Sequence, residues 1–276
     1  MSEALELLYE VEGLRSAELP EVLQELYPGT IGFGEPCLYA NFVSTIDGVV
    51  AIPSIPRSNA LVADDSAGDR LVMGLLRAFA DVVLIGAGTL ASSPTGTWLP
   101  EKVYPPAAAA FAELRRRTGQ SEKPEVAILT GHGSISPAHP LLVSGALVLT
   151  SEPGAVRLEG ELPAASTVVT LGEDTAIDPQ RAVDALLERG HRLILCEAGP
   201  HTFGGLVGFG LVDELFLTIS PLVAGDRGHL SRYGLAESVD LMPPGVRGRV
   251  LGIRRHEEHV FLRYDLDGGL TPSSPR

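Results

Sequence analysis

Short apolar runs alternate with stretches of helical periodicity over the first two-thirds of the chain. An apolar run of about four to eight residues is typical of a buried strand, whereas apolar residues that recur every three or four positions indicate an amphipathic helix. Two proline-rich connections, residues 49–63 and 90–106, are expected to be irregular. The expected helices cover residues 71–79, 107–118 and 179–190. The expected strands cover residues 37–43, 81–85, 126–130, 147–150, 167–170 and 193–196.

The chain then continues with strands alone. Residues 213–220 alternate between apolar and polar positions, and residues 250–253 and 259–266 are typical of an antiparallel hairpin. This order predicts a single α/β domain with a central, mostly parallel sheet, an antiparallel C-terminal edge and helices on both faces. The domain is expected to span residues 36–267, between an N-terminal arm (1–35, with a short helix near 18–27) and a flexible tail (268–276).

The composition narrows the choice of partners. The 276 residues are 45% apolar and 20% charged, as in a globular protein, and the net charge is −14. A chain this acidic repels nucleic acid and anionic membranes, so we expect neither as a partner. The sequence has no apolar run of about 20 residues and no signal peptide, so a cytoplasmic location is expected. Cys37 and Cys196, the only cysteines, form no zinc pattern, and no metal is expected.

Three expected strand exits carry the candidate chemistry: residues 44–48, 86–89 and 197–205. In open α/β sheets ligands bind beyond the carboxyl ends of the strands, so these exits are expected to line one cleft. Glycines there allow a dinucleotide to approach the backbone closely, and Pro200 is a helix-start signal that puts free N–H groups near a phosphate. The alternative is an ordinary strand-to-helix turn, and residues 86–88 lack the full dinucleotide fingerprint.

Charged side chains at these exits have two interpretations. Asp47 and Glu197 suit substrate binding or proton transfer, but an Asx-turn at Asp47 and a helix-cap contact by Glu197 are equally ordinary roles. Arg70 and Arg77 lie seven residues apart on one helix face. They are candidates for clamping a substrate phosphate, with solvated surface arginine as the alternative.

An ordered set of motifs extends along most of the chain. The motifs are residues 44–48, 75–78, 81–89, 197–200 and 211–215, followed by Pro221 and Gly225. In this order they resemble the reductase domain of the bifunctional riboflavin-biosynthesis deaminase/reductase, from about Leu38 onwards. The resemblance implies a dihydrofolate-reductase-like fold, a homodimer and the cofactor NADPH. It also implies that the small-molecule substrate is a phosphoribosylamino-pyrimidine, whose ribose becomes ribityl by hydride transfer to C1′.

The same resemblance implies roles for individual residues. Asp47, Arg77, Ser93 and Glu197 would face the substrate, and Asp47 and Glu197 would be the catalytic residues. The residues implied to lie along NADPH are Ser44, Gly86, Ala87, Gly88, Thr89, Thr130, Gly199, Pro200, His201, Thr202, Phe203, Gly204 and Gly205.

The sequence departs from the family pattern in ways that keep other functions open. The family's deaminase half, with its His and Cys zinc ligands, has no counterpart in this sequence. An acidic pair usually precedes the proline after Thr89, whereas this chain has Ser92 and Ser93 before Pro94. Ala198 replaces a glycine, which is a mild change. The alternatives are a dihydrofolate-reductase-like activity and a non-catalytic, NADPH-binding regulatory protein.

Overall fold

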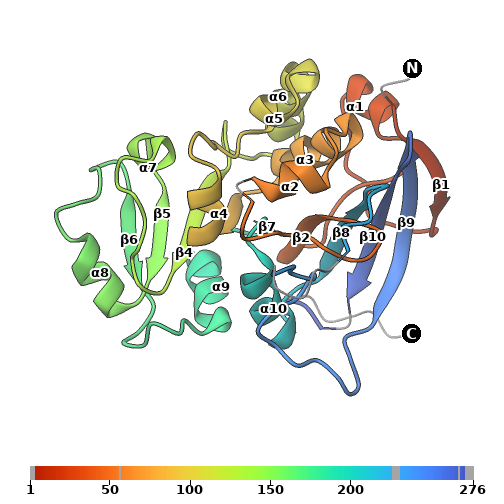
Figure 1. The fold of residues 1–276 in the computed structure, drawn as a ribbon. Helices are drawn as coiled ribbons and strands as arrows, with labels where there is room; N and C mark the ends of the chain where they lie inside the picture. The colour runs from red at the N-terminus through yellow and green to blue at the C-terminus, as the bar shows by residue number, and fades with distance from the viewer. Residues whose placement is uncertain (1–3, 56, 226–230, 267, 271–276) are drawn as a thin grey trace.

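Ten strands form a single twisted sheet in the part of the chain that the structure describes (Figure 1). The structure is a computed structural model that describes residues 4–55, 57–225, 231–266 and 268–270. The strand order is β1-β9-β10-β8-β2-β7-β3-β4-β5-β6. The strands are β1 (Glu6–Glu10), β2 (Cys37–Ser44), β3 (Val82–Gly86), β4 (Glu125–Thr130), β5 (Leu147–Thr150), β6 (Thr167–Thr170), β7 (Leu193–Cys196), β8 (Glu214–Ile219), β9 (Gly248–His256) and β10 (His259–Leu266).

The pairing confirms the predicted fold class. From β8 to β6 every neighbouring pair is parallel, whereas β10, β9 and β1 add an antiparallel edge. Cys196, the last residue of β7, pairs with Ala40 of β2 and with Leu84 of β3. The carboxyl ends of these three central strands therefore lie together at one edge of the sheet.

Helices cover both faces of the sheet, as expected. Consecutive strand residues such as Val83 and Leu84 belong to two different apolar clusters, because side chains alternate along a strand. One cluster packs α1, α3 and α6, and the other packs α9 and α10. The helices are α1 (Glu21–Leu26), α2 (Ser58–Val62), α3 (Ala67–Phe79), α4 (Ala87–Ser92), α5 (Pro100–Val103), α6 (Ala108–Arg117), α7 (Pro140–Ser144), α8 (Glu152–Leu158), α9 (Pro179–Glu188) and α10 (Pro200–Gly208), with a 3-10 turn at Pro105–Ala107.

The two connections expected to be irregular contain short helices. Helix α2 lies within residues 49–63, and residues 90–106 contain the end of α4 and all of α5. Helices of four to six residues are too short to show apolar periodicity and depend on tertiary packing. Leu90 and Trp98 are buried and supply that packing. Among the described residues, no helix is both long and apolar enough to cross a bilayer.

The N-terminal segment, expected to be an arm outside the domain, is part of its sheet and core. Strand β1 pairs antiparallel with β9 and covers the edge of the C-terminal hairpin. Leu23, Tyr27 and Ile31 are buried in the same cluster as α3. Residues 271–276 of the expected tail lie outside the described part of the chain.

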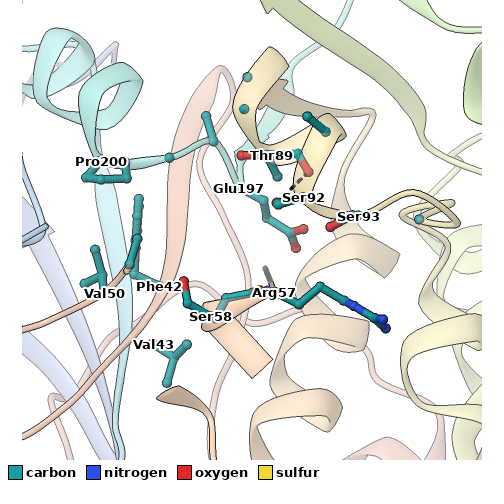
Figure 2. Close-up of a pocket in the computed structure, with 18 of the residues that line it drawn as sticks. Phe42, Val43, Val50, Arg57, Ser58, Thr89, Ser92, Ser93, Glu197 and Pro200 are labelled. Carbon is teal, nitrogen blue, oxygen red and sulfur yellow. Dashed lines mark hydrogen bonds between the residues drawn. The ribbon is translucent and has the colours of Figure 1, made fainter. Parts of the chain in front are cut away.

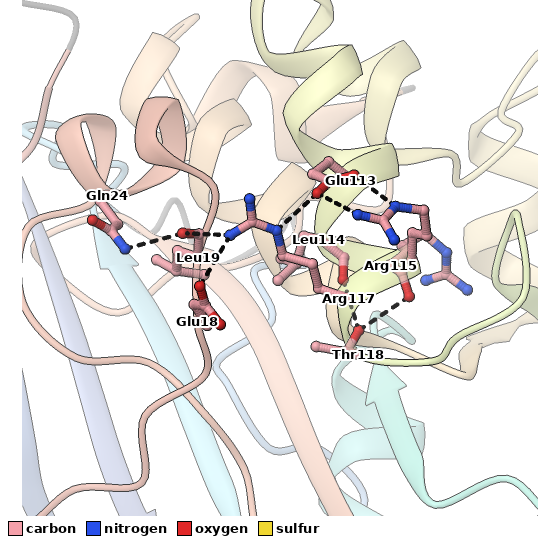
Figure 3. A network of polar contacts seen from close by, with 9 residues as sticks. Glu18, Leu19, Gln24, Glu113, Leu114, Arg115, Arg117 and Thr118 are labelled. Atoms are coloured by element: carbon pink, nitrogen blue, oxygen red, sulfur yellow. Dashed lines mark hydrogen bonds and ion pairs between the residues drawn. The ribbon is translucent and has the colours of Figure 1, made fainter.

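Polar contacts fasten this segment to helix α6 (Figure 3). The Arg117 guanidinium donates to the Leu19 carbonyl (3.4 Å) and lies 3.7 Å from the Glu18 carboxylate. On its own helix it donates to Glu113 (2.8 Å). Hydrogen bonds from Arg116 and Arg117 lower the pKa of Glu113 to about 2, so this carboxylate stays charged at all physiological pH values.

A buried ion pair joins β1 to β9. The Arg254 guanidinium donates to Glu10 (2.6 Å) and to the Pro28 carbonyl (2.9 Å), and it stacks over the Tyr27 ring. Arg254 is only 2% exposed, so its buried positive charge needs the opposite charge of Glu10 beside it. The neighbouring pair between Glu6 and Arg255 is solvent-exposed.

We expect Glu10→Ala to lower the free energy of unfolding by about 3 kcal/mol, because it leaves a buried guanidinium unpaired. The matched variant on the same strand, Glu6→Ala, should cost less than about 1 kcal/mol. Urea denaturation followed by circular dichroism measures both. Equal losses for the two variants would contradict a supporting role for the buried pair.

Candidate functional site

A pocket of about 950 Å³ opens at the carboxyl edge of the central strands (Figure 2). Its walls come from the end of β2, the connection that follows it, helices α3 and α4, and the turn between β7 and α10. The exits of β3 and β7 therefore meet in one cleft, as the sequence predicts. Part of the rim is made by backbone hydrogen bonds, because Val50 and Ala51 pair with Tyr233 in a short antiparallel bridge.

A buried ion pair lies in the wall of this pocket. Arg77 Nε donates to Glu197 Oε1 (2.9 Å), and Arg77 Nη2 donates to Oε2 (2.6 Å). Their side chains are 11% and 8% exposed. Figure 2 shows the Glu197 carboxylate directed into the pocket, between Phe42 on one side and Ser93 on the other. Two parallel charge-assisted hydrogen bonds fix its orientation.

This pairing decides between the interpretations of the charged residues. The N-cap of α10 is Gly199, and the Glu197 carboxylate accepts its hydrogen bonds from Arg77, so Glu197 is not the helix cap. Arg77 and Arg70 do not form a clamp, because Arg77 is engaged by Glu197 and Arg70 donates to the Asp65 carbonyl. Arg77 and Glu197 both line the pocket.

The glycines of the two strand exits differ in what surrounds them. Gly88 and Gly199 line the pocket, and a Cβ atom on either would meet nothing within 4 Å. Neither glycine is required by packing within the protein, so the space in front of each is available to a ligand. Ala87, Thr89 and Thr202 line the same region, together with Gly86, Pro200 and His201.

Gly204 and Gly205 have a different explanation. A Cβ at Gly204 would collide with the Glu237 carbonyl, and one at Gly205 would lie 3.2 Å from Pro179. These glycines serve the packing of α10, and neither lines the pocket. Phe203 is likewise buried, with its ring 4.8 Å from that of Phe42.

Residues 44–48, at the exit of β2, do not line the pocket. The exposed Asp47 carboxylate accepts hydrogen bonds from Thr45 and from the amides of Ala224 (3.0 Å) and Gly225 (2.7 Å). These bonds lower its pKa to about 2, so it holds no proton to donate near neutral pH. The contacts support the turn interpretation of Asp47 rather than the catalytic one.

Two further residues expected along the cofactor also lie outside the pocket lining. Ser44 is buried and donates to the Thr45 carbonyl (3.1 Å). Thr130 is buried, and its carbonyl accepts from the Thr150 hydroxyl. Ser93 does line the pocket, and its carbonyl accepts from His139 Nε2 (3.0 Å). Because His139 Nδ1 accepts a hydrogen bond from the Leu141 amide, Nε2 is the ring nitrogen that donates.

Several pocket residues were not expected from the sequence, among them Asp69, Met73 and Asn41. Asp69 and Met73 line the pocket together with Arg77, and their four-residue spacing puts all three on one face of α3. That spacing was the available signal, because Arg77 marks the face. Asn41 on β2 also lines the pocket, and its Oδ1 is buried without a hydrogen-bond partner. A buried acceptor without a partner is costly, and a ligand N–H or O–H would satisfy it.

The residues present suit an organic ligand. Open space at two glycines and an orphaned acceptor suit a bound organic ligand, whereas the described residues contain no cluster of His, Cys, Asp and Glu that could hold a metal ion. Burial raises the pKa of the Cys196 thiol to about 12, so this cysteine beside Glu197 is no nucleophile.

Comparisons with known proteins agree with this fold. The model of the RibD C-terminal domain matches residues 36–250, so the chain belongs to that family. A search of curated proteins finds no match.

Among solved structures, a pyrimidine reductase-like protein of Corynebacterium diphtheriae is 23% identical, with a TM-score of 0.64 over 84% of this chain and 92% of that one. The riboflavin biosynthesis reductase of Saccharomyces cerevisiae is 13% identical, with a TM-score of 0.55 over 86% and 93%. The deaminase/reductase of Thermotoga maritima is 18% identical, with a TM-score of 0.59 over 84% of this chain and 56% of its own. This chain thus spans little more than half of the bifunctional protein. At these identities the likeness concerns the fold.

Proposed function

We propose that the protein is an NADPH-dependent reductase that converts the ribose of a phosphoribosylamino-pyrimidine to ribityl. The observation that carries the proposal is a single pocket, in a member of the RibD C-terminal domain family, that joins two glycine-bordered strand exits to the buried Arg77–Glu197 pair. Bound NADPH would supply the hydride for C1′ of the substrate.

The proposed division of the pocket follows its chemistry. Gly88, Gly199 and the start of α10 would hold the cofactor, because free N–H groups at a helix N-terminus attract phosphate. Glu197 would accept hydrogen bonds from substrate hydroxyl or amine groups, with its orientation fixed by Arg77. The Asn41 Oδ1 atom would accept a further substrate N–H.

Turnover assays separate this proposal from its alternatives. NADPH oxidation followed at its absorbance band, with the phosphoribosylamino-pyrimidine and with dihydrofolate side by side, should show turnover of the pyrimidine. Turnover of dihydrofolate alone would favour the dihydrofolate-reductase-like activity. NADPH binding without turnover of either would favour the regulatory role, which the Ser92–Ser93 change keeps open. No binding at millimolar NADPH would exclude all three.

We expect Gly199→Val to weaken NADPH binding by about 10- to 100-fold, because overpacking against a ligand costs about 1–3 kcal/mol. Its unfolding free energy should stay near that of the wild type, since no protein atom lies near the added side chain. The matched control is Gly204→Ala, which should lose about 1–3 kcal/mol of stability against Glu237 yet keep its NADPH affinity once folded. Calorimetric titration and thermal denaturation measure both, and wild-type affinity in Gly199→Val would place the phosphate elsewhere.

We expect Glu197→Gln to reduce kcat about 100-fold with NADPH affinity unchanged, because the amide keeps the shape of the side chain and loses its charge. Glu101→Gln, on α5 outside the pocket lining, is the control for an acid-to-amide change nearby. The variant leaves Arg77 with a neutral partner, so its thermal midpoint should fall, and a single unfolding transition above the assay temperature would show that the fold survives without the ion pair. Undiminished turnover in that folded variant would remove Glu197 from the mechanism.

A further inference from the structure

Asp69 is a buried carboxyl in the pocket wall that none of the roles above uses. It lies two helical turns, about 12 Å along α3, from Arg77 and on the same face. Its exposed fraction is 3%. An acidic side chain is almost never fully buried unless it is paired, so its position needs a reason.

The position is not explained by capping of the helix. Asp69 stands three residues after the N-cap Ser66, where an acidic side chain often returns a hydrogen bond to the N-cap amide. Here the Ser66 amide donates to the Ala63 carbonyl instead. The Asp69 carboxyl is hydrogen-bonded to Thr218 on β8, across the helix–sheet interface.

The charged and titratable groups around Asp69 leave it without an ion-pair partner. The groups that influence it are Arg70 on α3, His259 on β10 and Glu197 after β7, and His256 packs against the adjacent Gly68. His259 Nε2 is directed to the Ala63 carbonyl (3.1 Å), and Arg70 is bonded to Asp65. In the described part of the chain no ion pair includes Asp69.

Asp69 and Glu197 are therefore two pocket carboxyls in opposite environments. The Glu197 carboxylate is held by two hydrogen bonds from the Arg77 guanidinium. Burial raises the pKa of Asp69, and the nearby Glu197 charge raises it further, while the Thr218 hydrogen bond and His259 act in the opposite direction. A buried carboxyl without an ion-pair partner, beside one that is paired with a guanidinium, is the usual arrangement for one acid and one binding or orienting group.

We propose that the Asp69 carboxyl is the proton donor of the reduction. The inference rests on the proposed function. As C1′ of the substrate gains a hydride from the reduced nicotinamide, the C1′–O4′ bond breaks and its electron pair remains on O4′. The Asp69 O–H bond breaks, its proton moves to O4′ to form the ribityl hydroxyl, and the remaining carboxylate regains a proton from water.

Asp69→Asn tests the step directly, because an amide keeps the shape but holds no acidic proton. We expect kcat to fall by about 10²- to 10⁴-fold with NADPH affinity unchanged. In the wild type, kcat should decrease as pH rises through the pKa of Asp69, and the residual activity of the variant should lack this decrease. The control is Asp65→Asn, an exposed acid in the same segment, which should behave as the wild type.

Thr218→Val provides a second variant that keeps the carboxyl. Because the Thr218 hydrogen bond lowers the pKa of Asp69, its loss should move the decrease in kcat to higher pH. A profile that does not move, or Asp69→Asn with wild-type kcat, would overturn the inference.

A carboxyl ¹³C NMR titration gives a readout that needs no turnover. The wild type should show one aspartate signal that titrates above the ordinary range near 4, and Asp69→Asn should lack it. A group whose pKa is raised in the folded state contributes stability at pH values below its unfolded pKa. This contribution is lost as pH rises through the folded-state pKa. The thermal midpoint of the wild type should therefore fall relative to that of Asp69→Asn as pH rises above about 4.

The outcomes separate the two proposals. If the wild type does not reduce the pyrimidine at all, the proposed function fails and the proton-donor role fails with it. If the wild type turns over and Asp69→Asn matches it, or if no aspartate titrates above its ordinary range, only the role of Asp69 is wrong.

Discussion

The ion pair between Arg77 and Glu197 sets the geometry on which the pocket depends. It joins helix α3 to the turn that follows β7, two elements that are 120 residues apart in the chain. Neither charge is tolerable alone at this depth, since unpaired buried ions cost several kcal/mol. The two elements therefore hold one another in position, and every side chain on the pocket face of α3 inherits that position. Met73 and Asp69 face the cleft because Arg77 does.

A second set of buried arginines stabilises the antiparallel end of the sheet. Arg254 pairs with Glu10, and Arg263 pairs with Glu214 (2.7 Å) while lying over the rings of Phe33 and Phe216. Arg254 links the C-terminal hairpin to Glu10, and Arg263 links it to Phe33, so both connect the hairpin to the N-terminal segment. The antiparallel edge is thus held by charge and aromatic contacts, whereas the strands of the parallel half are buried mainly among apolar side chains. The pocket opens from the parallel half.

The parts of the fold that were predictable are those with a strong local signal. Strand β5 matches residues 147–150, because a buried parallel strand is mostly apolar. Strand β6 matches residues 167–170, where threonine and valine favour a strand even at the partly exposed edge of the sheet. Helix α9 begins at the expected proline, with Asp178 as its cap. Strand β1 has no such signal: its side chains are mostly exposed, and it forms because β9 offers an edge far away in the sequence.

The candidate site was likewise predictable only where its residues carry a local sequence signal. Strand exits and glycines gave Gly88, Gly199 and Glu197, since parallel strands bring their carboxyl ends together. Asp47 and Gly204 carried the same sequence signals, but a distant loop and Glu237 account for them. Such partners, more than thirty residues away, leave no local pattern.

The backbone bridge between residues 50–51 and Tyr233 has a consequence for how this pocket can change over time. That part of the rim is shaped by main-chain hydrogen bonds, which any residue other than proline can make. The half-buried Tyr233 side chain that projects from it into the pocket lining is therefore free to vary in size and polarity without loss of the rim itself. Ligand preference can drift at this position at little cost to folding, as is usual for functional loops carried on a rigid scaffold.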